Sequence, residues 1–265
     1  LNDSVALVTG AASGIGRATA LALAARGCHL ALLDRNEAGL KETVQLVQAQ
    51  PIRISQHVVD LSNSAAIPTL PEQVLAAHPR VNILLNNAGV ALVGSFNELT
   101  LEEYRWLIEI NFLAVVCMTK AFLPILLNQP QAQIVNLSSV FGLIAPPFQT
   151  AYSAAKFAVR GFSEALRHEL AGTPVGVTVV HPGGVKTNIA ISARVAAAAD
   201  QVAAAEGAKA FTQSLRLSSD VAAAQIVQAI EKRSKRLLIG NDARLIDSVQ
   251  RLFPVSYWKI FSRLI

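Results

Sequence analysis

The sequence is poor in cysteine, in charge and in long apolar runs, and each shortage excludes a class of protein. Its 2 cysteines, Cys28 and Cys117, are too few for a disulfide framework and too far apart for a metal-binding pair. Charged residues make up only 15% of the chain, which excludes a disordered polyelectrolyte. Prolines and amides interrupt the uncharged segment 121–155, so no apolar stretch there approaches the roughly 20 residues of a membrane span. We expect a soluble protein of a reducing compartment, the cytoplasm, with no metal site and no signal peptide.

The basic charge of the chain is confined to its C-terminal end. Residues 1–231 carry 15 Lys and Arg against 16 Asp and Glu, whereas residues 232–265 carry 8 against 2. The remainder holds no basic and aromatic nucleic-acid module, so we predict no nucleic-acid partner. The segment 241–265 looks like two short amphipathic helices broken at Pro254. It can pack on another subunit, cover a substrate cleft or make peripheral contact with an anionic membrane, and these three alternatives stay open.

Short apolar runs alternate with longer amphipathic ones along residues 1–240. This alternation is typical of βαβ units in a parallel sheet. We predict an α/β fold of one domain, with about seven parallel strands in a doubly wound, three-layer αβα arrangement. The predicted strands are 5–8, 29–33, 53–58, 82–85, 133–136, 176–180 and 236–239. The predicted helices are 15–26, 36–48, 65–77, 101–126, 152–170 and 220–232. The Ala-rich segment 188–216 departs from the pattern and is either a substrate lid or a surface helical pair.

A glycine-rich turn joins the first predicted strand to the first predicted helix. It reads Val5-Ala-Leu-Val-Thr9-Gly10-Ala-Ala-Ser13-Gly14-Ile15-Gly16. Glycines at such a turn let the backbone approach a ligand that a Cβ would block. The free N–H groups and positive dipole end of the helix that follows suit a pyrophosphate. Glycines also serve ordinary tight turns, but the strand before and the helix after favour dinucleotide binding.

Two residues at the end of the second predicted strand bear on the choice of cofactor. Asp34 can accept hydrogen bonds from both hydroxyls of an adenosine ribose and would repel a 2′-phosphate. Its neighbour Arg35 can accommodate that phosphate. We therefore favour NAD(H), and NADP(H) remains the alternative because of Arg35. Asp60 and Leu61, after the third strand, lie at the same edge of the sheet, where Asp60 can cap a helix or contact the adenine.

Three polar residues in the second half of the chain have complementary chemistry. Tyr152 and Lys156 are spaced i, i+4, which places both on one face of a helix. A nearby ammonium stabilises a phenolate, so we expect Lys156 to lower the pKa of Tyr152 toward the working range. Ser139, at the end of the fifth strand, can donate a hydrogen bond to a substrate carbonyl beside the tyrosine. Each feature alone occurs often by chance.

In this order, the residues resemble the short-chain dehydrogenase/reductase family over nearly the whole chain. The matching motifs are Thr9-Gly10-x-x-x-Gly14-x-Gly16, Asn86-Asn87-Ala88-Gly89, Asn111, Ser139, Tyr152 with Lys156, and the loop 181–187. The resemblance implies a catalytic tetrad in which Tyr152 transfers a proton, Lys156 lowers its pKa and holds the nicotinamide ribose, Ser139 polarises the carbonyl and Asn111 anchors a proton-relay water. The cofactor-binding residues expected from the sequence and the resemblance are Gly10, Ser13, Gly14, Ile15, Gly16, Asp34, Arg35, Asp60, Leu61, Asn87, Ala88, Gly89, Tyr152, Lys156, Pro182, Gly183, Val185 and Thr187.

The function favoured by these features is NAD(P)-dependent interconversion of a secondary alcohol and a ketone, or of an alcohol and an aldehyde. The expected substrate is a small molecule, apolar and bulky, because the segments expected to wall it are poor in charge. Their apolar residues are Phe96, Phe141, Leu143, Ile144, Pro146, Phe148, Ile189 and Ile191. The alternatives are a non-catalytic cofactor-binding regulator or scaffold, and a membrane-surface binder acting through the tail. The family commonly forms oligomers, so a homodimer or homotetramer is expected.

Overall fold

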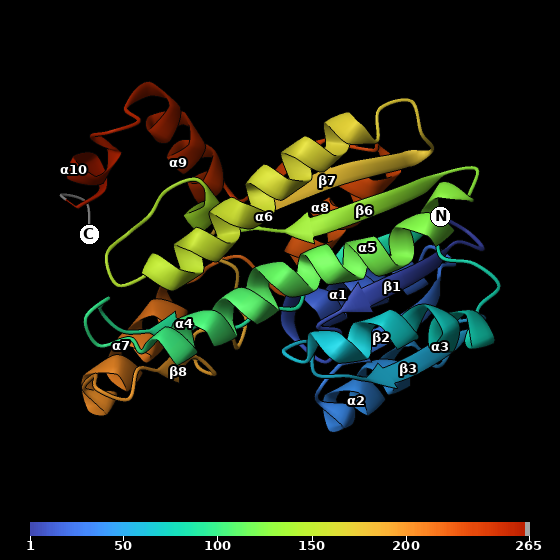
Figure 1. Ribbon diagram of the computed structural model, residues 1–265, viewed down its shortest axis with the longest axis horizontal. Helices are drawn as coiled ribbons and strands as arrows, with labels where there is room; N and C mark the ends of the chain where they lie inside the picture. Colours follow the sequence, from blue (N-terminus) through green and yellow to red (C-terminus); the bar gives the residue numbers. More distant parts are fainter. Residues whose placement is uncertain (263–265) are drawn as a thin grey trace.

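The seven predicted strands form one parallel sheet in the computed structural model, which describes residues 1–262 (Figure 1). The strand order is β3-β2-β1-β4-β6-β7-β9. These strands are β1 (Val5–Thr9), β2 (His29–Asp34), β3 (Ile54–Val58), β4 (Ile83–Asn86), β6 (Ala132–Leu137), β7 (Val175–Pro182) and β9 (Arg236–Ile239). The order reverses between β1 and β4, which creates a crevice at the carboxyl ends of these strands. The doubly wound fold predicted from the sequence is confirmed.

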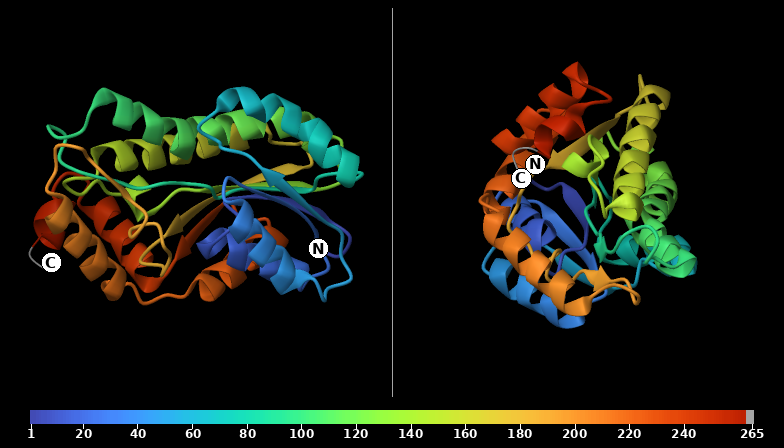
Figure 2. Two further views of the ribbon diagram at one scale, coloured as in Figure 1. Left: turned by 90° about the horizontal axis from the view of Figure 1, so that it is seen from below. Right: turned by 90° about the vertical axis from the view of Figure 1, so that its left-hand side faces the viewer.

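Helices cover both faces of the sheet, so the fold has three layers (Figure 2). One face carries α1 (Gly14–Ala24), α2 (Glu37–Val47) and α8 (Ser219–Glu231), and the other carries α3 (Leu70–Ala77), α5 (Ala114–Leu127) and α6 (Thr150–Glu169). Every residue of the central strands β1, β4 and β6 is buried, because helices cover both of their faces. The edge strand β3 exposes two of its residues, Gln56 and Val58.

Two helices predicted as continuous are divided. The segment predicted at 65–77 is a 3₁₀ turn, η1 (Ser64–Thr69), followed by α3, because Pro68 cannot donate a backbone hydrogen bond. The segment predicted at 101–126 is α4 (Leu101–Ile108), a π-helical turn η2 (Glu109–Leu113), and α5. Asn111 lies in that π turn, and nothing in the periodicity of the sequence marks it.

The helical run Leu101–Leu127 is long and apolar enough to cross a membrane by length and composition. Its α5 portion packs on the sheet, where Met118, Phe122 and Leu126 are fully buried beside Leu84 and Ile134. Burial in the protein core accounts for the apolar composition of this portion.

The remaining elements gather beyond one end of the sheet (Figure 1). In the Ala-rich segment 188–216, β8 (Arg194–Val195) pairs with β5 (Leu92–Val93), and α7 (Gln201–Ser214) follows. After β9 come α9 (Asn241–Leu252) and α10 (Tyr257–Phe261), on either side of Pro254. The helix α9 buries Ala243 and Asp247 and turns its apolar Leu245 and Leu252 outward, 57% and 74% exposed. Residues 263–265, which end the predicted tail, lie outside the described residues.

Candidate active site

A cavity of about 310 Å³ lies at the carboxyl edge of the sheet, at the reversal of strand order. It is lined by residues that follow six of the seven strands, so segments distant in sequence meet there. Of the expected site residues, the lining includes Gly10, Ser13, Gly14, Ile15, Asp34, Arg35, Asp60, Leu61, Asn87, Ala88, Gly89, Ser139, Tyr152, Lys156, Pro182, Gly183, Val185 and Thr187. The topology therefore brings the glycine turn and the Ser139, Tyr152 and Lys156 side chains to one cavity.

Hydrogen bonds between Thr9 and Asn87 join the ends of β1 and β4. The hydroxyl oxygen of Thr9 accepts from the backbone N–H groups of Asn87 and Ala88, both at 3.0 Å. The Asn87 amide donates to the carbonyl oxygens of Thr9 at 2.9 Å and Gly10 at 3.2 Å. These contacts fix the floor of the cavity at the point where the two halves of the sheet diverge.

The glycine turn suits an anionic group by its backbone conformation and its free donors. Gly10 and Gly14 have φ of +68° and +54°, a region that side chains rarely adopt. The first turn of α1 holds no acidic residue, and the Ser13 side chain does not cap the helix. The N–H groups at this helix start are therefore available to a pyrophosphate.

Gly16 was expected to contact the cofactor, but it does not line the cavity. A Cβ at Gly16 would collide with the Gly10 carbonyl oxygen and the Asn87 side chain. Its role is to let α1 pack closely on the turn, which explains the glycine without ligand contact.

Asp34 and Arg35 lie at the adenosine end predicted from the sequence. The Asp34 carboxylate accepts from the N–H of Ala12 at 3.1 Å and from that of Asn36 at 2.9 Å. It thus ties the glycine turn to the end of β2, while its remaining lone pairs can accept ribose hydroxyls. Arg35 is exposed at the same end of the cavity. Asp60 accepts from the N–H of Ser62 at 2.9 Å, so it caps the turn after β3.

Ser139, Tyr152 and Lys156 meet at the other end of the cavity. Ser139 begins the 3₁₀ turn η3 (Val140–Gly142), and its hydroxyl oxygen accepts from the N–H of Phe141 at 3.1 Å. Tyr152 and Lys156 lie on α6, with the ammonium nitrogen 5.6 Å from the centre of the tyrosine ring. Lys156 is buried and donates to the carbonyl oxygen of Leu137 at 3.0 Å.

The pKa values of this pair differ from the expectation. Burial raises the pKa of Tyr152 to about 12, and a hydrogen bond from Ser139 opposes that rise. Burial lowers the pKa of Lys156 to about 8. The pKa of Tyr152 therefore lies above its usual value and not in the neutral range that the sequence predicts, because burial removes water from the phenol.

Asn111 is completely buried and does not line the cavity. Its side-chain oxygen accepts from the Val90 N–H and its amide donates to the Val90 carbonyl, both at 2.8 Å. A Cβ on Gly89 would lie 3.3 Å from the Asn111 oxygen and 3.5 Å from the Lys156 nitrogen. Asn111 thus fixes the strand-end loop beside Lys156 from behind.

On the substrate side of the cavity, Val90 and Trp106 lie outside the segments expected to wall it. Val90, Trp106, Asn188, Ile189 and Ser192 line it, and of the expected apolar wall only Ile189 is among them. Leu143 and Ile144 were expected there, but they are buried in the protein. The other expected wall residues Phe96, Phe148 and Ile191 are 68%, 63% and 65% exposed. A signal for Trp106 existed in its i, i+4 spacing from Ile110, which also lines the cavity.

Known proteins with similar sequences show the family of this chain. Residues 4–196 match the family model described as short chain dehydrogenase. The Mycobacterium tuberculosis protein named "Putative oxidoreductase SadH" is 42% identical over 259 residues, which cover 97% of this chain and 93% of that protein. This chain therefore belongs to the short-chain dehydrogenase/reductase family, and it is an oxidoreductase of that family.

Solved structures similar to this chain include complexes with NAD and with 5-hydroxy-NADP. A short-chain dehydrogenase/reductase from Burkholderia phymatum in complex with NAD is 32% identical with a TM-score of 0.87, covering 94% of this chain and 93% of that one. An alcohol dehydrogenase from Thermococcus sibiricus complexed with 5-hydroxy-NADP is 26% identical with a TM-score of 0.76, covering 90% and 96%.

Proposed function

We propose that this protein interconverts a secondary alcohol and a ketone, or an alcohol and an aldehyde, with a nicotinamide dinucleotide as cofactor. The observation that carries the proposal is the meeting of Ser139, Tyr152 and Lys156 at one end of a cavity whose other end is the glycine turn. A bound NAD(P) would supply the hydride donor or acceptor there. The protein supplies orientation and a proton.

Tyr152 is the proposed proton donor and acceptor. Because burial raises its pKa to about 12, its phenol is protonated at neutral pH and can donate a proton to an oxygen on which charge develops. Ser139 would hydrogen-bond the same oxygen and hold it in line. Lys156 would contact the cofactor ribose and stabilise the phenolate once the proton has left, and Asn111 would support it through the loop at Gly89.

The remaining cavity residues fit a dinucleotide in an extended arrangement. The N–H groups at the start of α1 would hold the pyrophosphate, and Asp34 would bind the adenosine ribose. We propose NAD(H) as the cofactor because Asp34, held by two backbone donors, stands where a 2′-phosphate would be repelled. NADP(H) is the alternative, through Arg35.

The proposed substrate is apolar. Val90, Trp106 and Ile189 face the cavity beside Tyr152, with Asn188 and Ser192 as neutral polar groups. Arg194, on β8, stacks its guanidinium on Trp106 of this wall, 4.5 Å from the ring centre. Because the guanidinium is engaged with the ring, it is less available to bind an anionic substrate, which favours a neutral one.

Absorbance at 340 nm tests the proposal with NAD(H) and NADP(H) against aliphatic, aryl and steroid-like alcohols and ketones. We expect turnover of bulky neutral substrates with NAD(H), and a loss of about 10²- to 10⁴-fold in Tyr152→Phe with cofactor affinity kept. Tyr104→Phe, on α4, is the matched control: Tyr104 does not line the cavity, and the variant loses only a 3.4 Å hydrogen bond to the Thr150 carbonyl oxygen, so it should keep most of its activity. Full turnover by Tyr152→Phe would contradict its role in proton transfer, whereas cofactor binding without turnover by the wild-type protein would support the cofactor-binding scaffold. Preference for charged sugars or CoA esters would contradict the apolar site.

A further inference from the structure

The start of α9 contacts the loop that follows β7. A carboxylate oxygen of Asp242 accepts a hydrogen bond from the Gly184 N–H at 2.6 Å. A Cβ on Gly183 would collide with this carboxylate, so the approach requires glycine at that position. Pro182, Gly183, Val185 and Thr187 of this loop line the proposed cofactor cavity. The C-terminal segment 240–262, which contains α9 and α10, therefore fixes one wall of the site.

The end of the same segment contacts the loop that follows β6. The Tyr257 hydroxyl oxygen, on α10, accepts a hydrogen bond from the Ala145 N–H at 3.1 Å. Ala145 follows the η3 turn that begins at Ser139, and α9 also packs against that turn. Two helices encoded after the last strand thus hold the segment that carries the proposed carbonyl-polarising serine.

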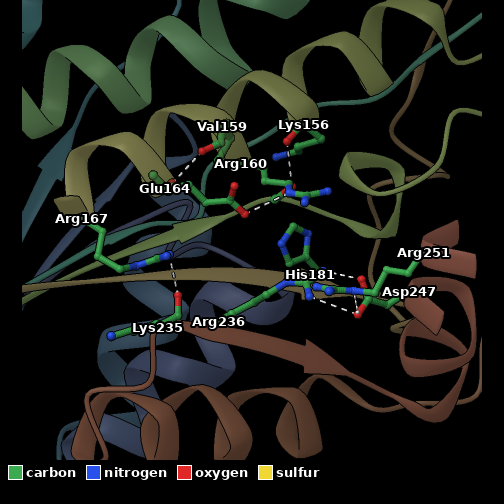
Figure 3. A network of polar contacts seen from close by, with 12 residues as sticks. Lys156, Val159, Arg160, Glu164, Arg167, His181, Lys235, Arg236, Asp247 and Arg251 are labelled. Carbon is green, nitrogen blue, oxygen red and sulfur yellow. Dashed lines mark hydrogen bonds and ion pairs between the residues drawn. The ribbon is translucent and has the colours of Figure 1, made fainter. Parts of the chain in front are cut away.

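A third group of polar residues lies behind Ser139 and includes His181, Arg236, Asp247 and Arg251, which are labelled in Figure 3. His181 on β7 is fully buried, with Nδ1 3.0 Å from the Ser139 carbonyl oxygen. Because a carbonyl only accepts, Nδ1 must carry the proton. Figure 3 shows the His181 ring next to the Arg236 guanidinium, which makes hydrogen bonds of 2.5 and 3.1 Å to Asp247 on α9. Arg251 also donates to Asp247, at 3.0 Å.

The His181 ring stays neutral in this setting. Burial lowers its pKa to about 4; the hydrogen bond with Ser139 raises it, and the nearby charges of Arg236 and Arg160 lower it. A neutral ring carries one proton, and this proton lies on Nδ1, which donates to the Ser139 carbonyl oxygen. His181 is therefore placed to hold the backbone of Ser139 and has no free role in proton transfer to substrate.

We propose that the C-terminal segment 240–262 is a positioning element of the active site. Asp242 holds the loop on the cofactor side and Tyr257 holds the loop on the serine side, while Asp247 fixes the Arg236 guanidinium near His181. This inference rests on the proposed function, because the positions of these two loops affect turnover only if the cavity is an active site. Misplacement of a reacting group by 1 Å can cost about 10²-fold in rate. Contacts that hold these loops in place therefore affect turnover.

Hydrogen exchange of the ligand-free, full-length protein tests the two direct contacts. Tyr257→Phe should speed exchange in a peptide containing Ala145 by about 3- to 10-fold, the range for one lost hydrogen bond. Asp242→Ala should do the same in a peptide containing Gly184, and Asp242→Asn, which keeps a side-chain acceptor, should restore most of the protection. Leu252→Ser is the matched control, because this outward residue of α9 contributes to none of these contacts. Unchanged exchange at both peptides overturns the proposal.

Kinetics and cofactor titration separate positioning from general stability. Tyr257→Phe should lower kcat about 3- to 10-fold, with the NADH dissociation constant unchanged and the thermal midpoint lowered by only about 2–4 °C. Asp242→Ala should raise the NADH dissociation constant, measured by fluorescence, by a similar factor. Equal kcat in wild type and Tyr257→Phe would overturn the link to catalysis. Absence of turnover in the wild-type protein would refute the proposed function, whereas the exchange and NADH titrations would still decide the positioning contacts.

Discussion

Lys156 combines a proposed catalytic role with an unfavourable position for a charged group, and this conflict can be measured as a pH dependence of stability. Burial lowers its pKa from 10.5 to about 8. Each pKa unit corresponds to about 1.4 kcal/mol, so the buried ammonium costs about 3 kcal/mol below pH 8. Between pH 8 and 10.5 the unfolded chain binds the additional proton, so the free energy of unfolding rises with pH and the penalty disappears.

Replacing Lys156 by Met removes the charge and retains a long apolar stem. The variant loses the hydrogen bond to the Leu137 carbonyl oxygen, worth about 1 kcal/mol once the lysine is neutral. We therefore expect Lys156→Met to be about 2 kcal/mol more stable than wild type at pH 7. Near pH 10 this advantage should shrink by about 2–3 kcal/mol, because the wild-type lysine is by then neutral in the folded state while most of the unfolded chain still carries the proton.

Urea unfolding of the ligand-free protein at pH 7, 8, 9 and 10, followed by circular dichroism, measures this difference. Lys120→Met is the matched control, since Lys120 is exposed on α5 and its replacement should give a difference independent of pH. Turnover by Lys156→Met should be lost while its stability increases, which is the expected trade-off at a functional site. A difference between Lys156→Met and wild type that stays constant from pH 7 to pH 10 would refute the argument from burial.

Three further predictions concern the core and the cofactor cavity. Phe122→Ala should lower the free energy of unfolding by about 3–5 kcal/mol, because Phe122 is completely buried between α5 and the sheet; calorimetry showing under 1 kcal/mol would be inconsistent with that packing. Gly16→Ala should reduce NADH binding, measured by fluorescence, because its Cβ would collide with Gly10 and Asn87 and displace the turn. Asp34→Ala should weaken NAD at least about tenfold and NADP less, as read from the two KM values; an unchanged ratio would contradict ribose recognition at Asp34.

Local patterns in the sequence were sufficient for the sheet and for most of the cavity lining. The strands are apolar on both alternating positions because helices cover both faces, so periodicity identified all seven. Glycines and polar residues at strand ends marked the cavity because the ends of parallel strands meet at one edge. The resemblance carried by Ser139, Tyr152 and Lys156 supplied the reaction class, which spacing alone could not distinguish from chance.

The π turn and the pKa values depended on packing. Periodicity averages over a helix, so the one-turn change at Asn111 has no signature in hydrophobic spacing. The Tyr152 and Lys156 pair is only a spacing in sequence, and the sign of its pKa changes depends on how much water the fold removes from each group.

In the C-terminal segment, the sequence determines some features and the tertiary structure determines others. Its sequence specified two amphipathic helices around Pro254 and a basic charge, because these are properties of neighbouring residues. Only the tertiary structure decided which face of α9 turns inward: Asp242 and Asp247 make hydrogen bonds to Gly184 and Arg236, while Leu245 and Leu252 face outward. Hydrophobic periodicity favours burial of the apolar face, but the partly buried Arg236 guanidinium and the Gly184 N–H each take a carboxylate partner from α9. Those partners became visible only when β7, β9 and α9 were assembled.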